Sequence, residues 1–398
     1  MKRQFTYRQT VVAGYLGYIT QAIVNNLAPL LFLIFREEFG ISLEKITLLT
    51  TLNFLLQLCV DLLSAKFVDR IGYRKCVVAA HVFSAAGLVG MAVLPTLLGN
   101  AYAGLLASLA LYAVGGGLIE VLISPIVEAC PTKNKAASMS LLHSFYCWGT
   151  VAVVLLSTLF LALCGKAAWR ALPCVWALLP LGNALLFARV PIASLTEENG
   201  GMSIGELLRS GLFWLFVLLM VASGASEQGM SQWASAFAES GLRVTKTAGD
   251  LFGPCLFSVL MGLSRVLYAR YGEKAGLTKV LIAFGGLCVV SYGVASFSPF
   301  PALSLAGCAL CGFSVGVMWP GVFSVASRSM PRGGTALFAL LALAGDLGCA
   351  AGPSVVGFAA GAAGDDLKKG LPAAVVFPLL LIACSLILLR RSGKQDNR

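Results

Sequence analysis

Two long apolar runs of this 398-residue sequence are separated by the stretch DRIGYRK at residues 69–75. A related stretch, ARYGEK at residues 269–274, separates two other apolar runs. Arg70 and Arg270 are 200 residues apart, and so are Gly72 and Gly272. Pro131 and Pro331 share that offset. Because the same spacing of 200 residues recurs at separate positions, the sequence predicts two halves that carry the same elements in the same orientation.

The composition is that of a membrane protein. Hydrophobic residues make up 58%, charged residues 12%, and the mean hydropathy is +0.86. A soluble globular chain has roughly 25% charged and 45–50% apolar residues. Too few charges are present to cover a surface that faces water, which excludes a soluble multidomain protein, a disordered chain and a disulfide-stapled secreted domain.

The apolar runs predict twelve transmembrane helices, because a bilayer core of ~30 Å needs ~20 apolar residues in a helix. Pro125, Pro320 and Pro353 are candidate kink points within them. The longest polar connector, residues 191–209, joins two predicted six-helix bundles at residues 1–190 and 210–398. The expected spans are 9–35, 44–66, 76–98, 101–129, 136–164, 169–190, 211–238, 248–269, 277–298, 301–329, 334–362 and 368–390.

The cations predict the orientation. Of the 29 Lys and Arg residues, 20 lie on the side of the termini and 8 on the opposite side, with Arg265 inside a span. Cytoplasmic loops carry the excess of Lys and Arg, so we expect a multi-pass protein of the plasma (inner) membrane with both termini in the cytoplasm. The net charge of +11 is therefore an orientation signal, and no nucleic-acid partner is expected.

The DRIGYRK stretch resembles the conserved loop between the second and third helices of the major facilitator superfamily. Ala65 and Tyr73 stand where the usual pattern has a glycine and a basic residue. The resemblance implies an all-α membrane protein with twelve helices in two six-helix halves. It also implies alternating access around a site between the halves, near the membrane midplane.

Three shorter stretches resemble the fucose–galactose–glucose proton-symporter branch of that superfamily. They are GGLIE at residues 116–120 with Pro125, LLHSF at 141–145, and GASE at 224–227 with Trp233. The resemblance implies that Glu120 takes part in proton coupling and sugar binding. That branch also has an aspartate in the first helix, where this chain has amides and Pro29; amides can bind hydroxyl groups but cannot carry a proton.

Three embedded acids are the candidate proton-coupling residues, Glu120, Glu227 and Asp346, because an ionisable group inside a span is costly and normally functional. Glu120 shares a helix face with Ser124 at i+4. For each acid the alternative is a structural hydrogen bond between helices. Amides and aromatic rings near these acids would suit a sugar, although a single histidine or aromatic residue is more often a packing residue. The candidate substrate-binding residues are Gln21, Asn25, Asn26, His143, Tyr146, Gln228, Gln232, Trp233 and Trp319.

Charged residues near the cytoplasmic helix ends are expected to form interhelical ion pairs that hold an outward-open state. These gating candidates are Asp61, Asp69, Arg70, Arg74, Glu128 and Arg265.

The sequence therefore predicts a secondary active transporter that takes up a small neutral hydroxylated solute, such as a monosaccharide, together with protons. A proton-driven exporter of drugs or metabolites with the same fold and a membrane-embedded enzyme are the alternatives. No cofactor or metal is expected, and the absence of a phosphate-binding loop argues against direct use of ATP. The expected partners are the solute, protons and the lipid bilayer, and we expect a monomer.

Overall fold

The computed structural model describes residues 5–131, 135–193, 202–271 and 276–395. Nearly all of these described residues are helical, and none of them lies in a strand. The chain divides into two compact units, Met1–Glu197 and Glu198–Arg398, which are described one at a time.

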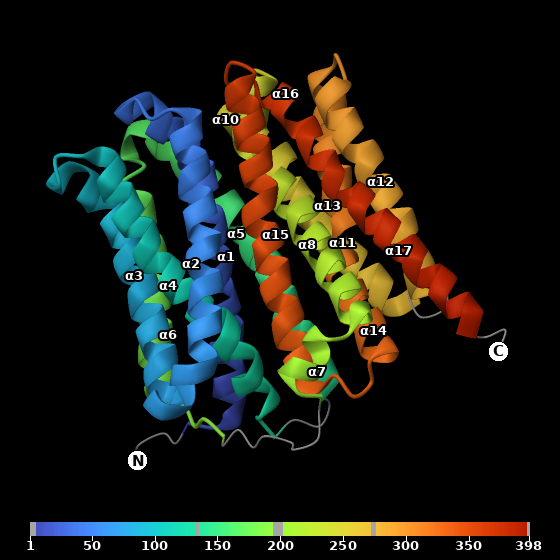
Figure 1. Cartoon of the computed structure of the whole chain (residues 1–398). Coiled ribbons are helices and arrows are strands. Elements are labelled where there is room, and N and C mark those ends of the chain that lie inside the picture. Colours follow the sequence, from blue (N-terminus) through green and yellow to red (C-terminus); the bar gives the residue numbers. More distant parts are fainter. Residues whose placement is uncertain (1–4, 132–134, 194–201, 272–275, 396–398) are drawn as a thin grey trace. The chain divides into compact units, whose positions relative to one another are not determined.

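The first unit is a bundle of long helices, drawn in blue to green in Figure 1. Helix α1 packs against α4, α5 and α6, and α4 also packs against α2 and α3. A buried apolar cluster in this bundle contains side chains from all six of its long helices, among them Tyr18, Ile123 and Phe187. Its helices are α1 (Tyr7–Phe39), α2 (Leu43–Ile71), α3 (Tyr73–Leu97), α4 (Ala101–Glu128), α5 (Lys135–Cys164) and α6 (Ala171–Phe187), with a 3₁₀ turn η1 (Lys166–Ala168) before α6.

The DRIGYRK stretch forms the corner between α2 and α3. Gly72 has φ +96°, a conformation that only glycine adopts without strain, and its N–H donates to the Val68 carbonyl at 2.7 Å. Arg74 then donates from Nη1 to the Phe187 carbonyl at 2.8 Å, which ties the start of α3 to the end of α6. The glycine and the second arginine of the motif thus have local structural roles. The repeat counterpart Gly272 lies outside the described residues.

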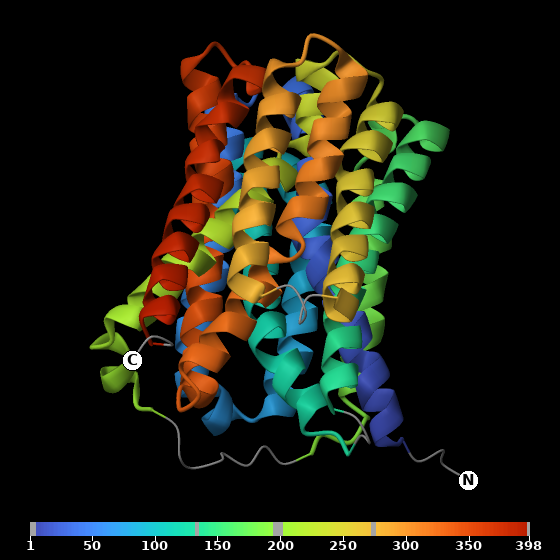
Figure 2. The ribbon, with the colours of Figure 1, turned by 90° about the vertical axis from the view of Figure 1, so that its right-hand side faces the viewer.

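The second unit is also a helical bundle, with α12 beside α17 in both views (Figures 1 and 2). Helix α8 packs mainly against α15, and α12 packs against α13 and α17. The helices are α7 (Ile204–Leu208), α8 (Gly211–Ser231), α9 (Ala234–Ala236), η2 (Phe237–Gly241), α10 (Lys246–Asp250), η3 (Leu251–Cys255), α11 (Leu256–Tyr271), α12 (Leu277–Phe297), α13 (Pro301–Val315), α14 (Met318–Ser329), α15 (Gly334–Ala362), α16 (Leu367–Gly370), η5 (Leu371–Val375) and α17 (Val376–Gln395).

Several predicted spans of the second unit are interrupted rather than continuous. The seventh breaks at Gln232 and Trp233, between α8 and α9, and the tenth breaks at Gly316 and Val317, between α13 and α14. Pro320 lies in the first turn of α14, whereas α4 and α15 continue as helices through Pro125 and Pro353. At these breaks the backbone N–H groups of Gln232, Trp233 and Gly316 still donate to carbonyls three or four residues earlier, as burial in a membrane bundle requires.

Eleven helical segments of the described chain are long and apolar enough to cross a membrane. The sixth predicted span forms a shorter apolar helix, α6, of 17 residues. At 1.5 Å per residue α6 is about 25 Å long. The prediction of an all-helical membrane protein is confirmed.

Glycines allow close helix packing between α11 and α13. A Cβ atom on Gly312 would lie 2.1 Å from the Phe257 carbonyl oxygen, and one on Gly316 would lie 2.7 Å from the Met261 carbonyl oxygen. Small residues permit such approach between membrane helices. The G-x-x-x-G pattern at these positions therefore serves packing within the second unit.

Candidate functional site

In the first unit, buried amides of α1 and α2 form a hydrogen-bonded chain that ends on the acid of α4. Gln21 donates from Nε2 to Glu120 Oε2 at 3.1 Å and to Gln57 Oε1 at 2.9 Å. Gln57 donates in turn to Asn25 Oδ1 at 2.9 Å, and Asn53 donates to the same oxygen at 3.4 Å. This amide chain joins the proton-carrier candidate to groups that suit a hydroxylated solute.

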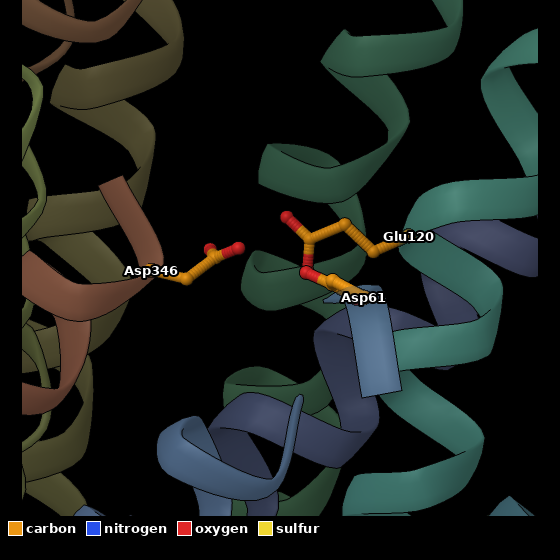
Figure 3. Close-up of side chains that lie close together, drawn as sticks. All are labelled: Asp61, Glu120 and Asp346. Carbon is orange, nitrogen blue, oxygen red and sulfur yellow. The ribbon is translucent and has the colours of Figure 1, made fainter. Parts of the chain in front are cut away.

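The acid of α2 belongs to the same region. A carboxylate oxygen of Asp61 lies within 4.8 Å of one of Glu120, and both side chains are half-buried. Figure 3 shows the two side chains approaching one another from α2 and α4. At 4.8 Å and an effective dielectric constant of about 20, two negative charges repel by about 3.5 kcal/mol. The structure thus brings Asp61, a gating candidate, alongside Glu120.

Further polar contacts link α1 to α4 and α5. Asn26 donates to the Ala22 carbonyl at 2.9 Å and to Thr150 Oγ1 of α5 at 3.2 Å. The Tyr18 hydroxyl is 2.8 Å from Ser124 Oγ, and the Tyr18 and His143 rings form a T-shaped pair with a centroid distance of 5.1 Å. His143 is exposed, whereas Asn26 is buried. Tyr146 is half-buried, and its carbonyl accepts a hydrogen bond from the Thr150 hydroxyl.

In the second unit, Glu227 of α8 ends a comparable chain. Gln232 donates to Gln228 Oε1 at 3.0 Å, and Gln228 donates to Glu227 Oε1 at 3.4 Å. The other carboxylate oxygen is 3.7 Å from Arg265 Nη2 of α11. Arg265 also donates from Nε to the Gly316 carbonyl at 3.3 Å, at the break between α13 and α14. Arg265 therefore pairs with a candidate coupling acid inside the unit.

The aromatic candidates of the second unit differ in exposure. Trp233 is fully buried, and its indole N–H donates to the Pro353 carbonyl of α15 at 2.9 Å. Trp319 is half-buried and packs closely against Gly345, where a Cβ atom would be only 2.2 Å from the indole ring. Gly345 precedes Asp346, which is buried in α15. Trp319 thus covers the backbone that carries the third acid.

The remaining gating candidates give less information. Arg70 and Arg74 are exposed, apart from the bond of Arg74 to α6 already described. The side chains of Asp69 and Glu128 lie outside the described part of the structure.

Sequence reasoning missed Asn53 and Gln57. Both are buried, and with Asp61 they repeat every four residues along α2, which puts them on one helix face. This polar stripe is present in the sequence. Amides are less costly than charges in a membrane helix, however, so they are a weaker indication of a functional site.

Sequence reasoning also missed a buried ion cluster in the second unit. Lys246 Nζ lies 3.0 Å from Asp250 Oδ2 and 4.0 Å from Glu239 Oε2, and the Lys246 side chain is only 9% exposed. Ser235 donates to Asp250 as well. The sequence presented Lys246 only as a loop cation, because the chain turns sharply just before it.

Comparison with known proteins identifies the fold. The profile of the Major Facilitator Superfamily matches residues 14–353. A curated relative, "Membrane protein MosC" of Rhizobium meliloti, is 24% identical over 300 residues, which are 73% of this chain and 70% of that protein.

Solved structures are similar over nearly the whole chain. The fucose:proton symporter of E. coli matches with a TM-score of 0.66 at 15% identity, covering 96% of this chain and 99% of its own. A bacterial homolog of the human lysosomal transporter Spinster matches with a TM-score of 0.77 at 15% identity, covering 98% of each chain. A D-xylose-proton symporter matches with a TM-score of 0.76 at 14% identity, covering 96% and 95%.

The family match covers most of the chain and agrees with the helical architecture and with the loop at residues 69–75. It assigns the chain to a family of membrane transporters rather than to enzymes. The chain belongs to the Major Facilitator Superfamily.

Proposed function

We propose that this protein is a secondary active transporter that takes up a small neutral hydroxylated solute, such as a monosaccharide, together with protons. Its two halves would alternate access to a central site. We further propose that it acts as a monomer in the plasma membrane, with both termini in the cytoplasm, as the distribution of cations favours.

The observation that carries the proposal is the position of Gln21. Its amide nitrogen contacts both the Glu120 carboxylate and the amide chain of Gln57 and Asn25. Amide groups donate to and accept from sugar hydroxyls, and a buried carboxyl can take up and release a proton. A single bonded network therefore contains both chemistries that a sugar–proton symporter needs. Similarity of fold to fucose:proton and D-xylose-proton symporters agrees with this proposal.

The second unit supplies a matching set. Glu227, Gln228 and Gln232 form the second amide–acid chain, and Trp319 presents a partly exposed ring. We assign solute contacts to the amides of both units and to Trp319. Proton coupling is assigned to Glu120, with Glu227 and Asp346 as further candidates, and gating to Arg265 through its pair with Glu227.

Reconstitution into liposomes tests the proposal. Labelled L-fucose, D-xylose and D-glucose would be offered with an inward proton gradient, and accumulation of at least one of them should collapse when an uncoupler is added. Glu120→Gln should abolish accumulation while leaving exchange of the same solute partly intact. Loss of a cationic or lipophilic compound from cells, with no sugar uptake, would instead favour the exporter.

A further inference from the structure

The carboxyl groups of Asp61 and Glu120 form a pair that the proposed function uses only in part. We infer that Asp61 and Glu120 together bind the transported proton. One of the two residues is then a neutral carboxylic acid, and the other is a carboxylate that faces it. This inference rests on the proposed proton coupling and adds Asp61 to it as a second proton-binding residue.

Geometry is the first argument. The two carboxylates come from different helices, α2 and α4, and their oxygens lie within 4.8 Å of each other (Figure 3). Two carboxylates that share a site cannot both ionise without strong repulsion, and their protons then come off in two steps that belong to the pair. A single proton removes the repulsion and stabilises the packing of α2 on α4.

Gln21 is an independent second observation. It is 3% exposed, its amide nitrogen touches the Glu120 carboxylate, and its amide oxygen has no hydrogen-bond partner among the described residues. A buried amide oxygen without a donor is costly. Turned over about its last bond, the amide would present this oxygen to Glu120 in place of its nitrogen, and the O–H of a protonated carboxyl would then supply the missing donor.

The space around Gln21 keeps its amide in place. A Cβ atom on Gly116 of α4 would lie 3.2 Å from both the Gln21 and the Gln57 side-chain oxygens. The glycine therefore lets these two amides press against α4, one turn before Glu120. This contact holds Gln21 where its orientation can respond to the charge of the pair.

Other titratable side chains of the first unit lie on α1, α3 and α5. Tyr18 of α1 bonds Ser124, one turn beyond Glu120, and His143 of α5 meets the Tyr18 ring. His81 of α3 is committed elsewhere, since its ring nitrogens bond the Val77 carbonyl and Asn183. Tyr18 and His143 are thus the neighbours whose ionisation a titration must separate from that of the pair.

Infrared difference titration of the reconstituted full-length protein tests the inference, because a protonated carboxyl has its own C=O band. Other acids, such as Glu227 and Asp346, absorb in the same band, so the titration of the double variant Asp61→Asn, Glu120→Gln is subtracted from each of the others. After this subtraction, the wild type should lose the signal in two steps separated by at least about one pH unit. Asp61→Asn and Glu120→Gln should each leave a single step from the remaining acid. Asp61→Glu, which keeps both acids, should retain two steps and guards against a variant that fails to fold.

Glu37→Gln is the control, because Glu37 lies at the end of α1 with its side chain 63% exposed. It should leave both steps in place. An unchanged Glu120 step in Asp61→Asn would overturn the inference. A step that moves when choline chloride is replaced by sodium chloride would also overturn it, since the pair would then bind a sodium ion.

The titration does not depend on the solute. Failure of the two-step behaviour, with proton-driven sugar uptake intact, would refute the pair and leave the proposed function standing. Two-step behaviour without any uptake would refute the proposed function instead.

Discussion

Removing the positive charge of Arg265 is expected to destabilise the second unit strongly. Arg265 Nη2 lies 3.7 Å from Glu227 Oε2, and the two side chains are 25% and 10% exposed. At an effective dielectric constant of about 20, this separation corresponds to an attraction of about 4.5 kcal/mol. Desolvation offsets much of that attraction in the intact pair, but a variant that lacks one partner leaves the other charge buried and uncompensated.

Arg265→Met keeps an unbranched and flexible, though shorter, side chain and removes its charge. We expect it to lower the free energy of unfolding by about 3–5 kcal/mol, and the melting temperature by roughly 10 °C. Part of this loss comes from the hydrogen bond to the Gly316 carbonyl, which Glu227→Gln leaves intact. The double variant should recover most of the stability, because neither charge is then left alone.

Thermal unfolding of the purified variants, followed by tryptophan fluorescence, measures the effect. Arg170→Met is the matched control: Arg170 lies 2.6 Å from Glu38, but both side chains are more than a third exposed, so the pair is worth about 0–1 kcal/mol. The reasoning fails if Arg265→Met unfolds within about 1 kcal/mol of the wild type. It also fails if the two single effects simply add in the double variant.

Three further predictions concern local structure. Gly312→Ala should destabilise the protein by at least about 1–3 kcal/mol, because the new Cβ atom meets the Phe257 backbone; Gly286→Ala, with nothing within 4 Å, should be neutral or slightly stabilising in the same melting assay. At the start of α7, hydrogen bonds from the Ser203 backbone and side chain lower the pKa of Glu206 below its usual 4.5. The stabilisation of α7 by these bonds is therefore complete above about pH 4.5. It is lost as the pH falls through the lower pKa that Glu206 has in the folded protein. The protection factors of the α7 amides, which correct for the intrinsic effect of pH on exchange, should therefore fall below pH 4.5 in the wild type, and a Glu206→Gln variant with the same pH profile would contradict this. Lys246→Met should cost about 3–5 kcal/mol, because it leaves Asp250 buried without its cation at 3.0 Å; a melting temperature equal to that of the wild type would show that the cluster does not depend on the lysine.

Local features of the sequence predicted the helical architecture well. The apolar runs predicted the spans, and the glycine of the DRIGYRK stretch marked a corner where φ is +96°. The sixth span came out shorter than expected, and the seventh and tenth contain breaks at Trp233 and Val317. Such breaks depend on which backbone groups find partners in neighbouring helices, so hydropathy does not reveal them.

The candidate site was predictable only in its separate parts. Glu120, Glu227, Gln21 and Asn25 were recognisable because polar groups in a membrane span are costly and few. Their partners were not recognisable in the same way, since Gln57 contacts Gln21 across 36 residues of sequence and Arg265 contacts Glu227 across 38. Helical periodicity tells which residues share a face, but it does not tell which two faces meet.

The sequence by itself determined that this protein lies in a membrane, that it is helical and to which family it belongs, because these follow from composition and local order. The tertiary structure alone decided that Asp61 faces Glu120 and that Arg265 faces Glu227. Such pairs depend on the rotation and depth of each helix against its neighbours, and packing across distant segments sets those two quantities.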